Sequence, residues 1–199
     1  MLAWLLLQVP LTLLPAPARP PECQLDLLPA YVLEERVLDD FNHQVARYVR
    51  LHRRLERALP PEHRFGDSED TAIGVDALHT AIADARPNAR PGTIFTPAVA
   101  NLLAARLDRA IARQHLTPAD VWVAMHLWDP SGLPAPTVNG RFPPVRHVRV
   151  WPALVAVLPA LPPELQYRFV GRDLVLLDVH ADLVVDILTN ALPAPEAAS

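Results

Sequence analysis

The pattern of apolar and polar residues divides the chain into a helical N-terminal part and one C-terminal stretch with strand character. Proline breaks helix interiors and central strands, so its 23 occurrences mark element boundaries. Five long windows lack proline and are the candidate elements: 30–59, 62–86, 98–117, 119–129 and 164–192. Only the last of these is rich in β-branched and aromatic residues, which favours strands there and helices before it.

The first window predicts the longest helix, over Leu33–Leu59. Its apolar residues recur every three or four positions and form one stripe. Members of the stripe are Val37, Leu38, Phe41, Val45, Tyr48, His52, Leu55 and Leu59. We interpret His52, the histidine on this apolar stripe, as a packed residue with one satisfied hydrogen bond rather than as a ligand or catalytic group.

Three further main helices and one short helix are predicted from start signals. Threonine followed by proline is a typical helix start, and Asp or Ser at the N-cap serves the same purpose. The signals are Asp67 or Ser68 for a helix to Ala85, Thr96-Pro97, Thr117-Pro118, and Pro152 for a short helix to Leu158. Trp122 and Trp128 of the fourth helix are interpreted as core residues rather than pocket lining. The region 129–144 that follows is predicted to be a loop with a turn at Asn139-Gly140.

The C-terminal stretch predicts a three-stranded antiparallel meander. Gln166–Val170 alternates in polarity, and Gly171-Arg172 is a two-residue turn of the Gly-X type. Leu174–Val179 is the second strand, and Leu183–Leu188 is the third after a turn at 180–182. The alternative for 181–189 is a helix. The expected fold class is therefore α+β, with four main helices packed on a C-terminal meander.

Part of this stretch resembles a known family. The segments are Leu161-Pro162-Pro163, Tyr167–Gly171, Asp173–Val179 and Leu183–Ile187. Together they look like the C-terminal β-meander module of RcnB-like periplasmic proteins, a family tied to nickel and cobalt homeostasis. The resemblance covers about 28 residues. It implies the meander and export, and it carries no metal function over to this chain.

The N-terminal residues predict an exported protein. Residues 1–14 are mostly apolar but too short to span a bilayer, which needs about 20 residues. Ala16-Pro17-Ala18 follows as a small-x-small cleavage pattern. The predicted organisation is a signal peptide at 1–18, a proline-rich linker at 19–31, one α+β domain at 32–192 and a disordered tail at 193–199. The expected location is periplasmic or extracellular, with the cytoplasm as the alternative.

Composition excludes two classes of protein. The net charge of -4 argues against nucleic-acid binding by bulk electrostatics. Cys23 is the single cysteine, so the chain can form no intrachain disulfide.

One helix face carries a row of cations, Arg47, Arg50, Arg54 and Arg57, which we name the arginine ridge. At 100° per residue these positions lie together, opposite the apolar stripe. The preferred interpretation is a solvated helix face. The alternative is docking of an anionic partner or attachment to a membrane surface.

The only cluster of candidate catalytic or ligand groups lies near the C-terminus. Asp178, His180 and Asp182 are two residues apart and would share one face of a strand, where they could bind a divalent ion or act as acid and base. The turn predicted at His180 would break that alignment, so these residues and Asp186 are interpreted as strand-end and turn formers. No HExxH, P-loop, GxSxG or GxGxxG motif occurs.

No catalytic, cofactor or metal residue is therefore assigned. The leading hypothesis is an exported, non-enzymatic binding or interaction protein without a cofactor. The alternatives are a metal-dependent or hydrolase-like enzyme that uses Asp178 and His180, and membrane-surface attachment through the arginine ridge.

Overall fold

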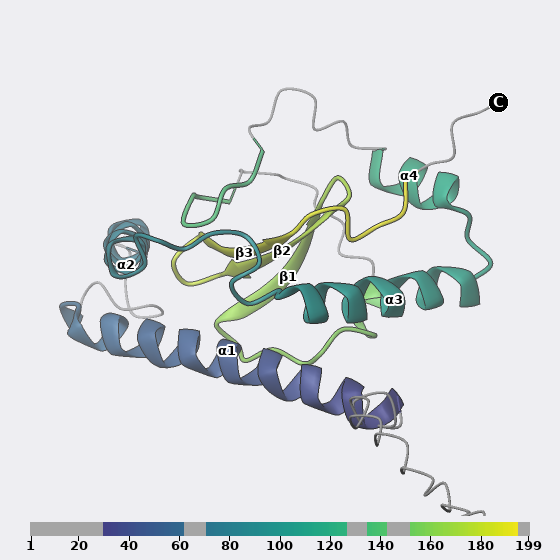
Figure 1. Cartoon of the computed structure of the whole chain (residues 1–199). Coiled ribbons are helices and arrows are strands. Elements are labelled where there is room, and N and C mark those ends of the chain that lie inside the picture. Colours follow the sequence, from purple (N-terminus) through teal and green to yellow (C-terminus); the bar gives the residue numbers. More distant parts are fainter. Residues whose placement is uncertain (1–29, 62–70, 127–134, 143–151, 195–199) are drawn as a thin grey trace, which may run out of the picture.

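Helices come first and a three-stranded sheet comes last in the computed structural model, which describes residues 30–61, 71–126, 135–142 and 152–194. The elements are α1 (Ala30–Ala58), α2 (Thr71–Ala85), α3 (Pro97–Arg113), α4 (Pro118–His126), α5 (Pro152–Val155), β1 (Leu165–Val170), β2 (Asp173–Asp178) and β3 (Leu183–Leu188) (Figure 1). The α+β class predicted from the sequence is confirmed. The predicted signal peptide and most of the predicted linker and tail lie outside the described residues. Among the described helices, none is long and apolar enough to cross a lipid bilayer.

The sheet is an antiparallel meander in the order β1-β2-β3. Gly171 turns the chain between β1 and β2 with a φ of 57°, a left-handed conformation that glycine adopts without steric cost. Between β2 and β3 the register shifts by one residue after Leu176, which leaves Val185 as a β-bulge. The alternative of a helix over 181–189 is wrong, because 183–188 form β3.

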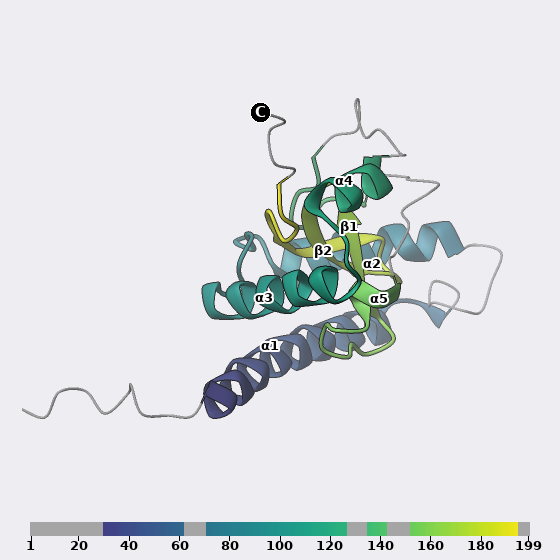
Figure 2. The same ribbon diagram turned by 90° about the vertical axis from the view of Figure 1, so that its right-hand side faces the viewer.

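The two faces of the sheet meet different partners. Leu174, Leu176 and Leu183 belong to the main hydrophobic core, which also takes side chains from α1, α2 and α3. Val175 and Val184 point the other way, into a small second core with Phe142. Figures 1 and 2 show α1 and α3 on the same side of the sheet. Every residue of β2 from Leu174 onward is buried, as predicted for a central strand covered on both faces.

The apolar stripe of α1 packs against this core. Phe41 is fully buried and stacks on Phe95, with ring centroids 6.3 Å apart. Tyr48 and His52 lie further along the same stripe and are also buried. The packed position of His52 predicted from the periodicity is therefore confirmed.

Two predicted helix starts differ in their chemistry. Thr117 and Asp120 form a reciprocal cap: the Asp120 amide donates to Thr117 Oγ1 at 3.1 Å, and the Thr117 amide donates to Asp120 Oδ2 at 2.8 Å. Thr96 precedes Pro97 as predicted, but its side chain makes no capping hydrogen bond. The caps proposed for α2, Trp128 and the side chain of Trp122 lie outside the described residues.

The described part of the predicted 129–144 loop is attached to β3. The Asn139 amide donates to the Val184 carbonyl at 2.8 Å, and the Val184 amide donates to the Gly140 carbonyl at 2.9 Å. Arg141 forms a β-bridge with Leu183. A Cβ at position 140 would collide with Thr137, which explains the glycine of the Asn-Gly turn. This segment therefore covers the outer edge of the sheet rather than forming a free loop.

Candidate metal centre

Asp178 is the centre of a buried polar cluster at the end of β2. Its Oδ2 atom accepts a hydrogen bond from the Tyr48 hydroxyl at 2.6 Å and lies 2.6 Å from Nδ1 of His52. Its Oδ1 atom accepts hydrogen bonds from the amides of His180 and Ala181, both at 3.0 Å. Because the carboxylate only accepts, the proton of this contact lies on His52 Nδ1.

Helix periodicity and turn chemistry bring these groups together. Tyr48, His52 and Glu56 are four residues apart on α1 and therefore share one face of the helix. Asp178 bonds to the amides two and three residues ahead, which is a common way for aspartate to stabilise a turn. That turn holds His180 beside α1, where the His52 and His180 ring centroids are 5.3 Å apart.

The second nitrogen of His52 faces two more potential ligands. His52 is fully buried, and its Nε2 atom makes no hydrogen bond with any described residue. Nε2 lies 3.6 Å from Glu56 Oε2, and Nδ1 of His180 lies 3.6 Å from Glu56 Oε1. One ligand atom from each of the three residues fits within 4.8 Å of the other two. We name this set of His52, Glu56 and His180 the HEH cluster.

The HEH cluster is partly exposed to solvent at Glu56 and His180. The side chains of Glu56 and His180 are 22% and 18% exposed, whereas that of His52 is 0% exposed. An ion would therefore approach past Glu56 and His180 and meet His52 at the inner end.

The electrostatic environment of His52 is negative. Burial alone lowers the pKa of His52, but the hydrogen bond and charge of Asp178, with the charges of Glu56 and Glu164, outweigh it and raise that pKa. Burial, and then the charge of Asp178, raises the pKa of Tyr48 well above its usual range, so its hydroxyl stays a donor. Carboxylates gathered around one imidazole attract positive charge, either a second proton on the ring or a metal ion.

Asp186, the other buried aspartate of the sheet, accepts hydrogen bonds only from main-chain amides among the described residues. Oδ1 accepts from the amides of Gly92 and Ile187 at 2.8 Å each, while Oδ2 accepts from those of Ile94 at 2.5 Å and Phe95 at 2.7 Å. These bonds attach the connection between α2 and α3 to β3. The interpretation of Asp186 as a structural carboxylate is consistent with this geometry.

The structure separates the four polar residues that the sequence placed near one another. His180 is a member of the HEH cluster, and Asp178 contacts the cluster through its hydrogen bond with His52. Asp182 lies apart, with Oδ2 3.7 Å from Arg141, and it adopts a positive φ of 47° in the turn. The turn at His180 thus breaks the alignment of Asp178, His180 and Asp182, as expected. Because Asp178 is fully buried, its geometry favours a positioning role over direct contact with a substrate.

All members of the arginine ridge are exposed side chains on α1. Arg53, which lies outside the ridge, pairs with the buried carboxylate of Glu164, with Nε 2.5 Å from Oε1. The proposed docking role of the ridge stays a prediction.

Sequence reasoning missed Glu56 and Tyr48 as members of a site. The available signal was the spacing Tyr48, His52, Glu56, which places three polar tips on the core-facing side of α1. Their convergence on Asp178 and His180 could not be read from the sequence, because the partners are more than 120 residues apart in the chain.

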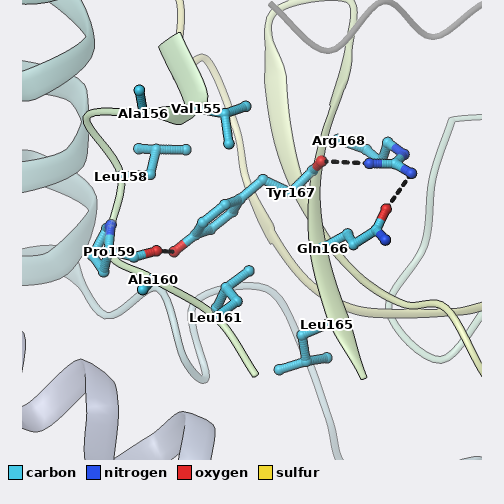
Figure 3. A pocket seen from close by; sticks show the side chains of 10 residues that line it. All are labelled: Val155, Ala156, Leu158, Pro159, Ala160, Leu161, Leu165, Gln166, Tyr167 and Arg168. Atoms are coloured by element: carbon cyan, nitrogen blue, oxygen red, sulfur yellow. Dashed lines mark hydrogen bonds between the residues drawn. The ribbon is translucent and has the colours of Figure 1, made fainter. Parts of the chain in front are cut away.

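A separate cavity of about 360 Å³ lies beside β1. Figure 3 shows the Tyr167 ring reaching across it to donate a hydrogen bond to the Pro159 carbonyl, at 3.1 Å. The other walls are mainly apolar, from Val155, Leu158 and Leu161. This cavity brings together no set of candidate ligand or acid–base groups from the described residues.

Comparison with known proteins finds no match to this chain among protein-family models, curated proteins or solved structures. The resemblance to the RcnB-like module stays a prediction. The functional assignment therefore depends on the geometry of the site.

Proposed function

We propose that this protein binds one divalent transition-metal ion through His52 Nε2, a carboxylate oxygen of Glu56 and His180 Nδ1. The observation that carries the proposal is the state of His52. Its Nδ1 is held by Asp178, and its buried Nε2 lacks a hydrogen-bond partner among the described residues while facing two other ligand groups. Metal-bound histidines usually donate their other ring nitrogen to a carboxylate in this way, which fixes the ring and its tautomer.

The distances in the HEH cluster suit a small ion. Zinc–nitrogen bonds of about 2.0–2.1 Å place neighbouring ligand atoms of a tetrahedral site roughly 3.3 Å apart. His52 Nε2 and His180 Nδ1 each lie 3.6 Å from Glu56, but from different carboxylate oxygens. One ligand atom from each residue lies within 4.8 Å of the other two. Closing this set on an ion therefore requires contraction by up to roughly 1.5 Å. The exposed sides of Glu56 and His180 permit this movement.

The ligand types favour particular metals. Two imidazoles and one carboxylate suit zinc, nickel, cobalt, copper or ferrous iron, whereas magnesium prefers oxygen ligands and keeps its waters. Three protein ligands leave at least one position for water or for a group of another molecule. A binding role agrees with the non-enzymatic class favoured by the lack of catalytic motifs, and export stays a prediction.

Calorimetric titration of chelator-treated protein tests the proposal. We expect saturable binding of one Zn²⁺ per chain and much weaker binding of Mg²⁺. Glu56→Gln should weaken Zn²⁺ binding by tenfold or more, because it removes a charged ligand at a partly exposed position where folding depends little on it. The matched control is Glu35→Gln, an exposed glutamate of the same helix.

His180→Ala should weaken Zn²⁺ binding as well, whereas His43→Ala should not, since His43 is an exposed histidine of α1. Circular dichroism of each variant checks that the fold is retained. Absence of saturable Zn²⁺ binding, or equal losses in the cluster variants and their controls, would show that the buried histidine serves only the Asp178 hydrogen bond.

A further inference from the structure

A second small cavity, of about 230 Å³, lies between α1, the end of α2 and the residues that precede α3. Two arginines line it, Arg47 from α1 and Arg86 from the residue after α2. We name it the arginine pocket. Its volume is below the roughly 300–1,000 Å³ of pockets for drug-sized ligands, so it suits a smaller molecule or a single functional group.

Arg86 is a half-buried cation that makes no direct ion pair with any described carboxylate. Its NH1 and NH2 donate to the side-chain oxygen of Asn139 at 3.3 Å and to the Val185 carbonyl at 3.0 Å. Its guanidinium carbon lies 5.0 Å from the centre of the Tyr48 ring. All three partners are uncharged, and no carboxylate in the described part of the chain forms an ion pair with it. Buried charges in proteins are usually paired, so this arrangement leaves electrostatic free energy to be gained from an anion.

Arg47 adds a second positive charge to the same cavity. It is exposed, and within the described ranges it has neither a hydrogen-bond nor an ion-pair partner. Burial lowers the pKa of Arg86, the charges of Asp186 and Asp178 partly offset it, and the charge of Arg47 adds to the lowering; the group remains protonated at neutral pH. Two cations that face one cavity repel each other, and an anion bound between them would offset this repulsion.

The remaining walls combine a neutral donor with apolar surface. Gln44 is half-buried and makes no hydrogen bond with other described residues, so its amide can donate to a ligand. Leu51 and Ile94 supply apolar contacts. The amide of Ile94 is already bonded to Asp186 and the hydroxyl of Thr93 donates to Arg90, so neither donates into the cavity.

We propose that the arginine pocket binds a small oxyanion, a carboxylate or a phosphate group, between the guanidinium groups of Arg47 and Arg86. Guanidinium groups bind both oxyanions through paired, charge-assisted hydrogen bonds. This site is separate from the HEH cluster, but Tyr48 contacts residues of both. Its ring faces Arg86, and its hydroxyl donates a hydrogen bond to Asp178.

Titration calorimetry of chelator-treated protein tests this inference, with inorganic phosphate, succinate and chloride as probes at matched ionic strength. We expect one saturable site for phosphate or succinate and none for chloride. The probe with the higher affinity shows which oxyanion the pocket prefers. Arg47→Gln should weaken that binding about tenfold or more, because it removes a charged donor. Arg50→Gln, an exposed arginine of the same helix outside the cavity, should leave it unchanged.

Two outcomes would overturn the inference: no saturable site for either oxyanion, or equal weakening by Arg47→Gln and Arg50→Gln. Arg86→Gln provides a second test once circular dichroism has shown that it folds. Glu56→Gln separates this proposal from the metal proposal, since it should weaken Zn²⁺ binding and leave oxyanion binding intact. Loss of oxyanion binding in Glu56→Gln would place the anion at the HEH cluster and contradict the arginine pocket.

Discussion

Asp178 and Asp186 are two fully buried carboxylates on the same face of one small sheet, yet their surroundings differ in kind. Asp186 has two main-chain amides on each oxygen. Asp178 has two amides on one oxygen, and the Tyr48 hydroxyl and the His52 ring on the other. Both are satisfied, but of the two only Asp178 is hydrogen-bonded to a side chain with a second ligand atom, His52.

The difference shows how to separate a structural from a functional buried carboxylate. A carboxylate that accepts hydrogen bonds only from main-chain amides fixes the backbone and orients no side chain through a hydrogen bond. A carboxylate that orients a histidine sets the tautomer of that ring and thereby the state of its other nitrogen. In this chain that other nitrogen, Nε2 of His52, faces Glu56 and His180.

The largest effect is expected for Asp186→Asn. Each Asp186 oxygen accepts from two amides, so the asparagine NH2 must face two donors in either orientation. We expect the free energy of unfolding to fall by about 2–6 kcal/mol, because two amide donors lose their acceptor at a cost of about 1–3 kcal/mol each. Urea denaturation followed by circular dichroism measures the loss. A loss smaller than that of Asp178→Asn would contradict the comparison.

Asp178→Asn should affect metal binding more than folding. The amides of His180 and Ala181 keep the asparagine oxygen at the Oδ1 position, so its NH2 group faces His52 Nδ1. This NH2 donates to Nδ1, which moves the imidazole proton to Nε2 and blocks that ligand. We expect Zn²⁺ affinity to fall about 10–100-fold, the usual cost of losing such an outer partner. Titration calorimetry measures this affinity. An unchanged affinity in the folded variant would show that Asp178 has no part in Zn²⁺ binding.

A smaller effect is expected for Tyr48→Phe, which removes one donor to the Asp178 carboxylate. Hydrogen bonds to charged groups contribute about 1.5–3 kcal/mol, against about 0.5–1.5 kcal/mol for neutral pairs. Tyr167→Phe is the matched control, because that hydroxyl donates to a neutral carbonyl, that of Pro159. The fall in the free energy of unfolding should be larger for Tyr48→Phe, and the reverse order in urea denaturation would count against a charged Asp178.

The smallest effect is expected on the outer face of α1. The double variant Arg50→Gln, Arg54→Gln changes exposed residues and should alter the free energy of unfolding by no more than about 0.5 kcal/mol. Zn²⁺ affinity should stay the same. Co-sedimentation with anionic vesicles, run in parallel, tests the arginine ridge: equal binding of the double variant and the unchanged chain supports a solvated face.

Local patterns predicted the elements of this fold. The spacing of apolar residues predicted α1, Thr-Pro pairs predicted the starts of α3 and α4, and Gly171 predicted the first hairpin. The site was less accessible, because it depends on how α1 lies across the end of β2. His52 on an apolar stripe is a packed histidine in either interpretation, and only the arrangement in space shows what its two nitrogens face.

The metal site can be located by anomalous diffraction at the zinc absorption edge, from crystals of the protein grown with Zn²⁺. We expect one strong peak about 2.0–2.2 Å from His52 Nε2, a Glu56 oxygen and His180 Nδ1, with Asp178 still bonded to His52 Nδ1. Well-ordered density for these residues without an anomalous peak among them, at saturating Zn²⁺, would contradict the metal proposal.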